Sequence, residues 1–247
     1  MKPQRTAIAR RIKNHEKTAL LAGGPGRRFG SDLPKQYQEI GGRCMLAHAL
    51  QAFADWGDLA GTVLAIDDGD RWFAGISVQL PLPVRTVAGG AERMNSVINA
   101  VRALQGEADE HDWVLVHDAV RPCLCADDLR RLTESTGADG VGGLLATRVT
   151  DTLKKAQDDS SQARVVTTMD RQGLWQAMTP QVFPYGLLRS ALEAAQEAGK
   201  MLGDEAAAME LAGHRPLLVE GRLDNIKVTQ AADLAFAEAI LAGHRRV

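Results

Sequence analysis

Short apolar segments alternate with stretches of helical periodicity along most of this 247-residue chain, and this alternation constrains the fold more than any other feature. It favours a mainly parallel sheet with helices on both faces. The predicted strands are Ala19–Leu21, Thr62–Ile66, Val84–Val87, Trp113–His117, Gly143–Val149 and Pro216–Val219. The predicted helices are Met45–Phe53, Arg93–Leu104, Leu187–Ala198 and Ala231–Leu241. Such sheets bind ligands beyond the carboxyl ends of their strands, so functional residues should follow the strands.

One region, about 147–183, breaks the alternation. It holds two β-like segments, Thr150–Lys155 and Arg164–Met169, separated by the polar run Gln-Asp-Asp-Ser-Ser at 157–161. We interpret the region as a β-arm that protrudes from a single domain spanning 18–247. An arm that cannot bury itself packs on something else, and a partner subunit is the simplest candidate.

Composition excludes several classes of protein. The net charge of -2 gives no general attraction to nucleic acid or to an anionic membrane. No apolar run approaches the roughly 20 residues that span a bilayer. Three cysteines are too few for a disulfide framework and favour a reducing compartment, so we expect a cytoplasmic protein. The basic segment 1–17 lacks the apolar core of a secretory signal and is expected to be a flexible extension, with a transit peptide as the alternative.

A glycine-rich loop, Gly23-Gly24-Pro25-Gly26-Arg27-Arg28, follows the first predicted strand. Glycines allow backbone N–H groups to approach an anion closely, although a tight turn would explain them as well. The loop has neither the P-loop pattern nor the spacing of a dinucleotide fingerprint, which argues against a dinucleotide-dependent dehydrogenase. Arg28 and the nearby Lys35 could neutralise phosphate charge, and phosphoryl transfer requires mainly positioning and charge neutralisation.

Two further motifs follow predicted strands. Gly89-Gly90-Ala91-Glu92-Arg93 opens a helix, whose N-terminus could hold a phosphate or a base edge, although an ordinary capped helix has the same pattern. His117-Asp118-Ala119-Val120-Arg121-Pro122 ends an apolar strand with an acid that could hold Mg²⁺ beside a triphosphate. The alternative is that Asp118 caps the next turn and pairs with Arg121.

In order along the chain, these motifs resemble the 2-C-methyl-D-erythritol 4-phosphate cytidylyltransferase family. The resemblance includes Pro-Lys-Gln-Tyr at 34–37, Asp-Thr-x-Lys at 151–154, Thr-Pro-Gln at 179–181 and Asp-Asn-Ile-Lys-Val-Thr at 224–229, and extends roughly from 18 to 241. It implies a Rossmann-like nucleotidyltransferase (GT-A-like) fold. It also implies transfer of CMP from CTP to 2-C-methyl-D-erythritol 4-phosphate, with release of pyrophosphate, in isoprenoid precursor biosynthesis.

The resemblance assigns roles by position. Catalytic residues would be Arg28, Lys35, Arg171 and Lys227. Nucleotide-binding residues would be Ala22, Gly23, Gly24, Gly26, Gly90, Ala91, Ser96 and Asp118, while Thr152, Arg171, Thr179 and Lys227 would bind the acceptor. Asp118 and Asp224 would hold Mg²⁺ or another divalent cation. The family inserts its arm into a neighbouring subunit, which implies a homodimer with a shared active site. His117 is interpreted as a structural hydrogen-bonding residue, since an ionised phosphate needs no general base.

Several positions depart from the family pattern, among them Gly23-Gly24-Pro25, where Ala-Ala-Gly is commoner, and Asn95, where aspartate is common. Ala91 stands where many relatives carry aspartate, and Gly203 stands where the family has a threonine, which predicts a weaker cap for the following helix. Two other functions remain open at this point. One is the same chemistry on ribitol 5-phosphate, and the other is nucleotide binding without catalysis.

Overall fold

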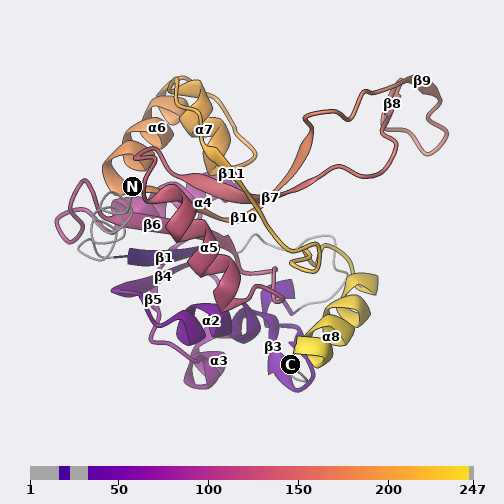
Figure 1. Ribbon diagram of the computed structural model, residues 1–247. Coiled ribbons are helices and arrows are strands. Elements are labelled where there is room, and N and C mark those ends of the chain that lie inside the picture. Colours follow the sequence, from indigo (N-terminus) through magenta and orange to yellow (C-terminus); the bar gives the residue numbers. More distant parts are fainter. Residues whose placement is uncertain (1–16, 23–32, 245–247) are drawn as a thin grey trace, which may run out of the picture.

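A seven-stranded sheet forms the centre of the computed structural model, which describes residues 17–22 and 33–244 (Figure 1). The strand order is β11-β7-β10-β6-β1-β4-β5. The strands are β1 Lys17–Ala22, β4 Gly61–Ile66, β5 Arg85–Ala88, β6 Trp113–Asp118, β7 Gly143–Arg148, β10 Trp175–Pro184 and β11 Leu217–Glu220. β10 runs antiparallel to β6 and β7, and the remaining neighbours pair in parallel. The predicted mainly parallel sheet is confirmed.

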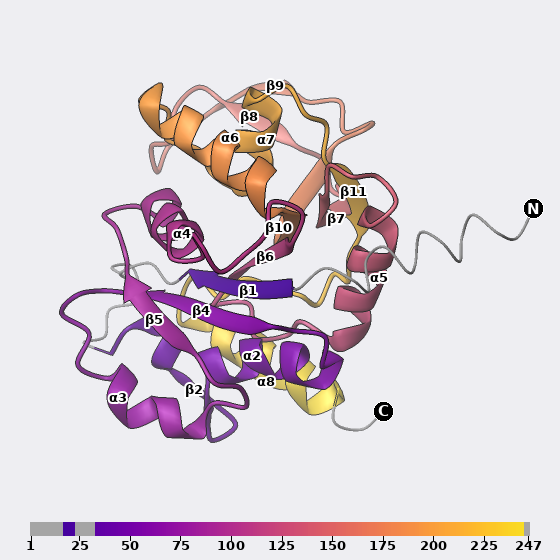
Figure 2. The same ribbon diagram turned by 90° about the vertical axis from the view of Figure 1, so that its left-hand side faces the viewer.

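Helices cover both faces of the sheet. One apolar cluster joins α2 (Met45–Trp56) and α5 (Ala126–Thr136) to Leu115 of β6. The other joins α4 (Arg93–Arg102), α6 (Tyr185–Glu197) and α7 (Glu205–Leu211) to Val114 and Val116 of the same strand. Figure 2 shows α4 and α6 on one side of the sheet and α2 on the other. All six residues of β6 are buried, as expected for a strand covered on both faces.

Shorter elements and the last helix complete the described fold. They are η1 Lys35–Tyr37, β2 Glu39–Ile40, β3 Arg43–Cys44, α3 Phe73–Ile76 and η2 Ser77–Gln79. The last helix, α8 (Ala232–His244), packs through Ala237 against a small cluster that includes Ile40 and Val120. Across residues 17–22 and 33–244, no helix has both the length and the apolar character needed to span a bilayer.

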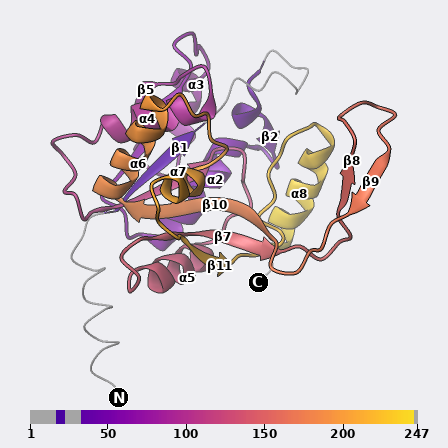
Figure 3. The same cartoon turned by 90° about the horizontal axis from the view of Figure 1, so that it is seen from above.

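The arm is shorter than predicted. Residues 175–183 belong to β10, so the arm is confined to 149–174 between β7 and β10. Its strands β8 (Lys154–Ala156) and β9 (Val165–Thr168) form an antiparallel pair that stands away from the sheet (Figures 1 and 3). Every residue from 150 to 174 is exposed. Most of the predicted basic extension, 1–16, lies outside the described residues.

The helices α3 and α5 were not predicted, and α7 was expected only as the helix that follows Gly203. α5 carries mostly polar residues around its buried Leu129 and Leu132, which weakens the periodic apolar signal. The expected weakness at the start of α7 is absent, because Asp204 is the N-cap and its carboxylate accepts a hydrogen bond from the Ala207 N–H at 2.9 Å. The glycine at 203 therefore does not remove the cap.

Candidate active site

Three parallel strands bring their carboxyl ends to one edge of the sheet. Ala22, the last residue of β1, lies in register with Asp118 at the end of β6. β4 ends at the same edge, where the Gly89 N–H donates a 2.6 Å hydrogen bond to the Ile66 carbonyl. The chain therefore leaves β1 beside Asp118 and close to the turn that precedes α4. Four predicted residues of the glycine loop, Gly23, Gly24, Gly26 and Arg28, lie outside the described residues.

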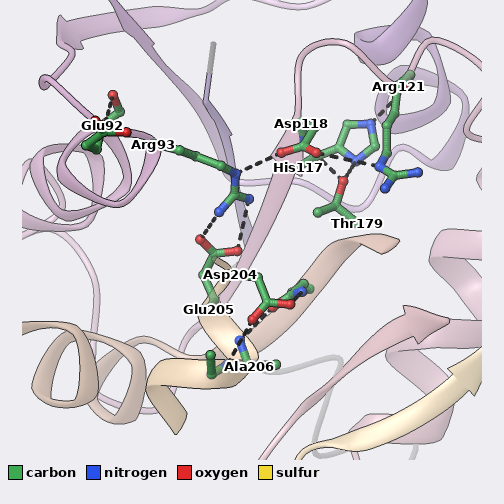
Figure 4. Close-up of polar contacts among 12 residues, drawn as sticks. Glu92, Arg93, His117, Asp118, Arg121, Thr179, Asp204, Glu205 and Ala206 are labelled. Atoms are coloured by element: carbon green, nitrogen blue, oxygen red, sulfur yellow. Dashed lines mark hydrogen bonds and ion pairs between the residues drawn. The ribbon is translucent and has the colours of Figure 1, made fainter. Parts of the chain in front are cut away.

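Asp118 is the centre of a buried charge network (Figure 4). The residue is only 4% exposed. Its Oδ1 accepts from Arg93 Nε at 2.9 Å, while its Oδ2 lies 2.8 Å from Lys227 Nζ and 3.6 Å from Arg121 Nε. Burial alone would raise the pKa of this carboxyl, but Arg93, Lys227 and Arg121 together hold its pKa well below its usual range. Asp118 is therefore a permanent negative charge surrounded by cations.

A neutral histidine and a threonine orient the backbone at Asp118. The Asp118 N–H donates to Thr179 Oγ1 at 3.1 Å, and Thr179 Oγ1 lies 3.0 Å from His117 Nδ1. His117 Nε2 lies 3.2 Å from the Arg121 carbonyl, which can only accept, so the ring proton is assigned to Nε2. Burial lowers the pKa of His117 to about 4, so the ring is neutral at pH 7. This geometry agrees with the structural role predicted for His117.

Thr179, which lines the cavity beside Asp118, has a hydroxyl that makes two hydrogen bonds. With Nε2 of His117 protonated, Nδ1 is the acceptor and the Thr179 hydroxyl donates its proton to it. The residue is buried, and its hydroxyl orients the backbone of Asp118, while the predicted contact of Thr179 with the acceptor stays a prediction.

Hydrogen bonds hold the segment 224–229 beside Asp118. Asn225 Nδ2 donates to the Thr179 carbonyl at 2.9 Å, and the Asn225 carbonyl accepts from Arg121 Nη1 at 2.7 Å. The Val228 N–H donates to the Val120 carbonyl at 2.9 Å. These bonds hold the backbone on both sides of Lys227, whose side chain is 39% exposed and reaches Asp118 from the solvent side.

A cavity of about 120 Å³ opens over this network. It is lined by Arg93, Asp118, Arg121, Ala177, Met178, Thr179, Gln181, Gly203, Asp204 and Lys227. Larger hollows of about 440 and 560 Å³ lie elsewhere, at the start of β4 and β5 and between α2 and α8. Among these three hollows of the described residues, the small cavity is the one lined by Asp118, Arg93 and Lys227, and on that ground we place the chemistry there rather than in the two larger ones.

The turn before α4 is shaped by Ser96. Its Oγ accepts from the Gly90 N–H at 3.0 Å, and a Cβ at position 90 would lie 2.3 Å from Asn95 Cβ, so only glycine fits. Glu92 and Asn95 form a capping box at the helix start. Ala91 is exposed on this turn. The predicted nucleotide contacts of Gly90, Ala91 and Ser96 stay predictions.

The remaining predicted residues make no contact with Asp118 that the described part of the chain shows. Arg171 and Thr152 are exposed on the arm, where Arg171 donates to the Thr150 carbonyl. Lys35 begins η1, whose buried Tyr37 packs with α2. Asp224 faces α8 instead, accepting from Arg222 Nε at 2.9 Å and lying 3.0 Å from His244 Nε2. The predicted pairing of Asp118 and Asp224 around a metal is therefore not seen.

The residues present fit a metal that arrives with a nucleotide better than a preformed metal cage. Across 17–22 and 33–244 there is no group of three or more His, Cys, Asp or Glu side chains that could hold a metal ion. Mg²⁺ is commonly held by one or two carboxylates together with substrate phosphates, and Asp118 offers one such carboxylate.

Two members of the network, Arg93 and Glu205, were missed as functional residues. Both lie in motifs that carry the resemblance, Glu-Arg at 92–93 and Asp-Glu-Ala at 204–206. Arg93 Nη1 lies 2.6 Å from Glu205 Oε1 across a separation of 112 residues. The motifs could have marked both residues as functional, but they do not predict that the two side chains meet.

The sheet, the edge beside β1 and the cations around one buried acid define an α/β nucleotidyltransferase. The chain belongs to the 2-C-methyl-D-erythritol 4-phosphate cytidylyltransferase (IspD) family, whose pattern matches residues 18–243. It is similar to the enzyme of that name from Ectopseudomonas mendocina, with 47% identity over 87% of this chain and 91% of the relative. The Ralstonia nicotianae enzyme of the same name is 48% identical over 91% of this chain and 90% of the relative.

Solved structures support the same family. The crystal structure of a 4-diphosphocytidyl-2C-methyl-D-erythritol synthase matches with a TM-score of 0.79 and 38% identity, covering 92% of this chain and 99% of that one. The Francisella tularensis 2-C-methyl-D-erythritol 4-phosphate cytidylyltransferase matches with a TM-score of 0.74 and 32% identity, covering 91% and 99%. The fold predicted from the sequence is thus that of solved family members.

Proposed function

We propose that this protein transfers CMP from CTP to 2-C-methyl-D-erythritol 4-phosphate, giving 4-diphosphocytidyl-2-C-methyl-D-erythritol and pyrophosphate. The observation that carries the proposal is the buried Asp118 with Arg93, Arg121 and Lys227 around it, beside the end of β1, in a chain of this family. The protein serves isoprenoid precursor biosynthesis.

In this reaction an oxygen of the acceptor phosphate attacks the α-phosphorus of CTP. A new P–O bond forms, the bond to the β-phosphate oxygen breaks, and pyrophosphate leaves. The attacking oxygen is already ionised near pH 7, so no general base is required. The main obstacle is charge, because two unit negative charges about 4 Å apart repel by about 4 kcal/mol at an intermediate dielectric.

The cations of the site reduce that repulsion. Lys227 is partly exposed and ends 2.8 Å from Asp118, so its ammonium group can turn towards an incoming phosphate without losing its buried counterion. Arg28 and Lys35 are assigned to the charge that develops at the α-phosphate, as the family motif implies. The Gly90 turn, Asp118, Ala22 and the glycine loop are assigned to the nucleotide.

A divalent cation such as Mg²⁺ belongs to the proposal. Asp118 would hold it together with the triphosphate, and its chemistry is to neutralise the charge of the departing pyrophosphate.

The exposed residues of the arm are the reason to propose a homodimer. Arg171 and Thr152 are assigned to the acceptor, yet both stand on a segment whose residues are exposed. The arm also exposes Val165, Val166 and Met169, which are 63%, 62% and 43% exposed. A second copy of the chain would cover these side chains and receive Arg171 at its own Asp118 site. The three cysteines are free thiols, which fits the reducing cytoplasm as the proposed location.

Pyrophosphate release in the presence of CTP and Mg²⁺ tests the function. With 2-C-methyl-D-erythritol 4-phosphate as acceptor we expect sustained turnover, and with ribitol 5-phosphate little or none. Faster turnover with ribitol 5-phosphate would reassign the acceptor. Binding of CTP without product from either acceptor would mean that the protein binds the nucleotide but does not catalyse the transfer.

A further inference from the structure

Arg93 links two buried carboxylates through different parts of one guanidinium group. Glu205, which begins α7 and is 1% exposed, accepts from Arg93 Nη1 at 2.6 Å and from Nη2 at 3.1 Å. Asp118 accepts from Arg93 Nε at 2.9 Å. Figure 4 shows Arg93 between the two acids. Glu205 therefore contacts the site through Arg93.

The geometry of the guanidinium group decides what this link does. Its five N–H groups form a rigid planar fork, so an arginine whose two terminal nitrogens are turned towards one carboxylate presents its Nε side to another. Arg93 is in that position and contacts Asp118 through Nε at Oδ1, while Oδ2 faces Lys227 and Arg121. If Glu205 could not accept both bonds, Arg93 would be free to turn its terminal nitrogens onto Asp118 and occupy both oxygens.

Glu205 is itself held in place by β10. Gln181 of β10 accepts from the Ala206 N–H at 2.7 Å and donates to Asp204 Oδ2 at 3.0 Å. These bonds fasten the first turn of α7 to the strand that also carries Thr179, the residue that accepts from the Asp118 N–H. The side chain and the backbone of Asp118 are thus oriented from the same strand by separate routes.

We infer that Glu205 is a positioning residue for the transfer reaction, acting through Arg93 to keep Arg93 off Oδ2 of Asp118, so that the partly exposed Lys227 can yield this oxygen to nucleotide and metal. The inference rests on the proposed function, because its readout is turnover. A purely stabilising role is a poor explanation, since replacing buried ion pairs by apolar residues is often neutral or favourable for stability. Loss of a residue that orients a ligand-holding group typically costs about tenfold to a hundredfold in activity or affinity.

The first test is Glu205→Gln in the full chain, which keeps the size of the side chain but removes its charge and one acceptor. We expect kcat/KM for CTP to fall about tenfold to a hundredfold and the Mg²⁺ concentration for half-maximal rate to rise. Asp128→Asn is the matched control, because Asp128 is a 0% exposed carboxylate of α5 that pairs with Arg131. The control is expected to change the melting temperature without changing either kinetic value.

A double-mutant cycle with Arg93→Lys separates positioning from general damage. If Glu205 acts through Arg93, Glu205→Gln adds little to the loss already caused by Arg93→Lys. Losses that multiply, or a Glu205→Gln protein with wild-type kinetics, would overturn the inference. If Glu205→Gln does not fold, Glu205→Asp takes its place, since the shorter acid cannot reach both terminal nitrogens. A wild-type protein without turnover would instead refute the proposed function.

Discussion

The carboxyl edge of the sheet and the arm hold their charged side chains in opposite ways. At the edge, Asp118 is 4% exposed and is contacted by cations from α4, from the turn after β6 and from the segment before α8. Along the arm, residues 150–174 are all exposed, and Arg171 is held by a backbone carbonyl of the arm itself. Asp118 and the cations around it are organised within one chain, while Arg171 and Thr152, two of the residues proposed to bind the acceptor, project from it.

The difference has an energetic basis. Ordering a charged side chain costs conformational entropy and desolvation, and the edge offsets that cost with a dense set of ion pairs and hydrogen bonds. The arm has no comparable set among its described contacts, so its side chains would be ordered only when something packs against them. A partner subunit would therefore add ordered arm residues to a site whose buried charges are already in place within one chain.

The largest expected effect concerns Lys35, in η1. Lys35→Ala should lower kcat about a hundredfold or more, because it removes a cation assigned to the charge that develops at the α-phosphate. The measurement is pyrophosphate release at saturating CTP and acceptor. Lys200→Ala, at an exposed lysine beyond α6, is the control and should keep the wild-type rate. A near-normal rate for Lys35→Ala would remove Lys35 from the mechanism.

The next effect concerns the buried histidine of the edge. Because the folded pKa of His117 is about 4 and the unfolded value is about 6.5, the unfolded chain takes up a proton that the folded chain resists. The stability contributed by His117 is therefore fully present above pH 6.5 and is lost as the pH falls towards 4, by about 3 kcal/mol.

Urea unfolding at pH 7 and pH 4 measures this loss. The substitution His117→Gln keeps a hydrogen-bonding side chain that does not titrate, so the variant should lose about 3 kcal/mol less than the wild type between the two pH values. Equal losses for both proteins would show that His117 is not buried as a neutral ring.

A smaller effect is expected at the arm. Arg171→Ala should raise KM for 2-C-methyl-D-erythritol 4-phosphate roughly tenfold and change KM for CTP less, because one charge-assisted contact to the acceptor is lost. Steady-state kinetics with each substrate varied in turn provides the measurement. An equal rise in both KM values would contradict the division between a nucleotide edge and an acceptor arm.

Dimers that combine two different variant chains test whether the arm of one chain serves the active site of the other. Co-expressed Lys35→Ala and Arg171→Ala chains should recover about a quarter of the wild-type rate at low acceptor concentration, since half of randomly paired dimers are mixed and each has one intact site. Recovery requires that the arm of one chain serves the edge of the other. A rate no higher than the mean of the two separate variants would show that each arm serves its own chain.

Much of the fold was predictable from local pattern. The apolar runs at 62–66 and 113–117 predicted β4 and β6 almost to the residue, because side-chain periodicity reflects burial on a sheet. The predicted arm wrongly included most of β10. The position of this strand between β6 and β7 depends on pairing with residues far away in the sequence, which local pattern does not reveal. α5 was missed because polar residues dominate its sequence.

The candidate site was predictable only in part, for the same reason. Asp118 and Lys227 were predicted separately from their motifs, and the structure shows them 2.8 Å apart. The bond between Thr179 and His117 and the link from Glu205 to Arg93 were not predicted. Each joins side chains at least 62 residues apart, and no periodic pattern specifies such a pair.

The sequence by itself determined which segments form strands and helices and which charged residues follow the strands, because both depend on neighbours a few residues away. The tertiary structure alone decided which charges meet. Arg93, Asp118, Glu205 and Lys227 come from four separate segments, and whether a cation neutralises an acid depends on their distance in space and on the water excluded between them.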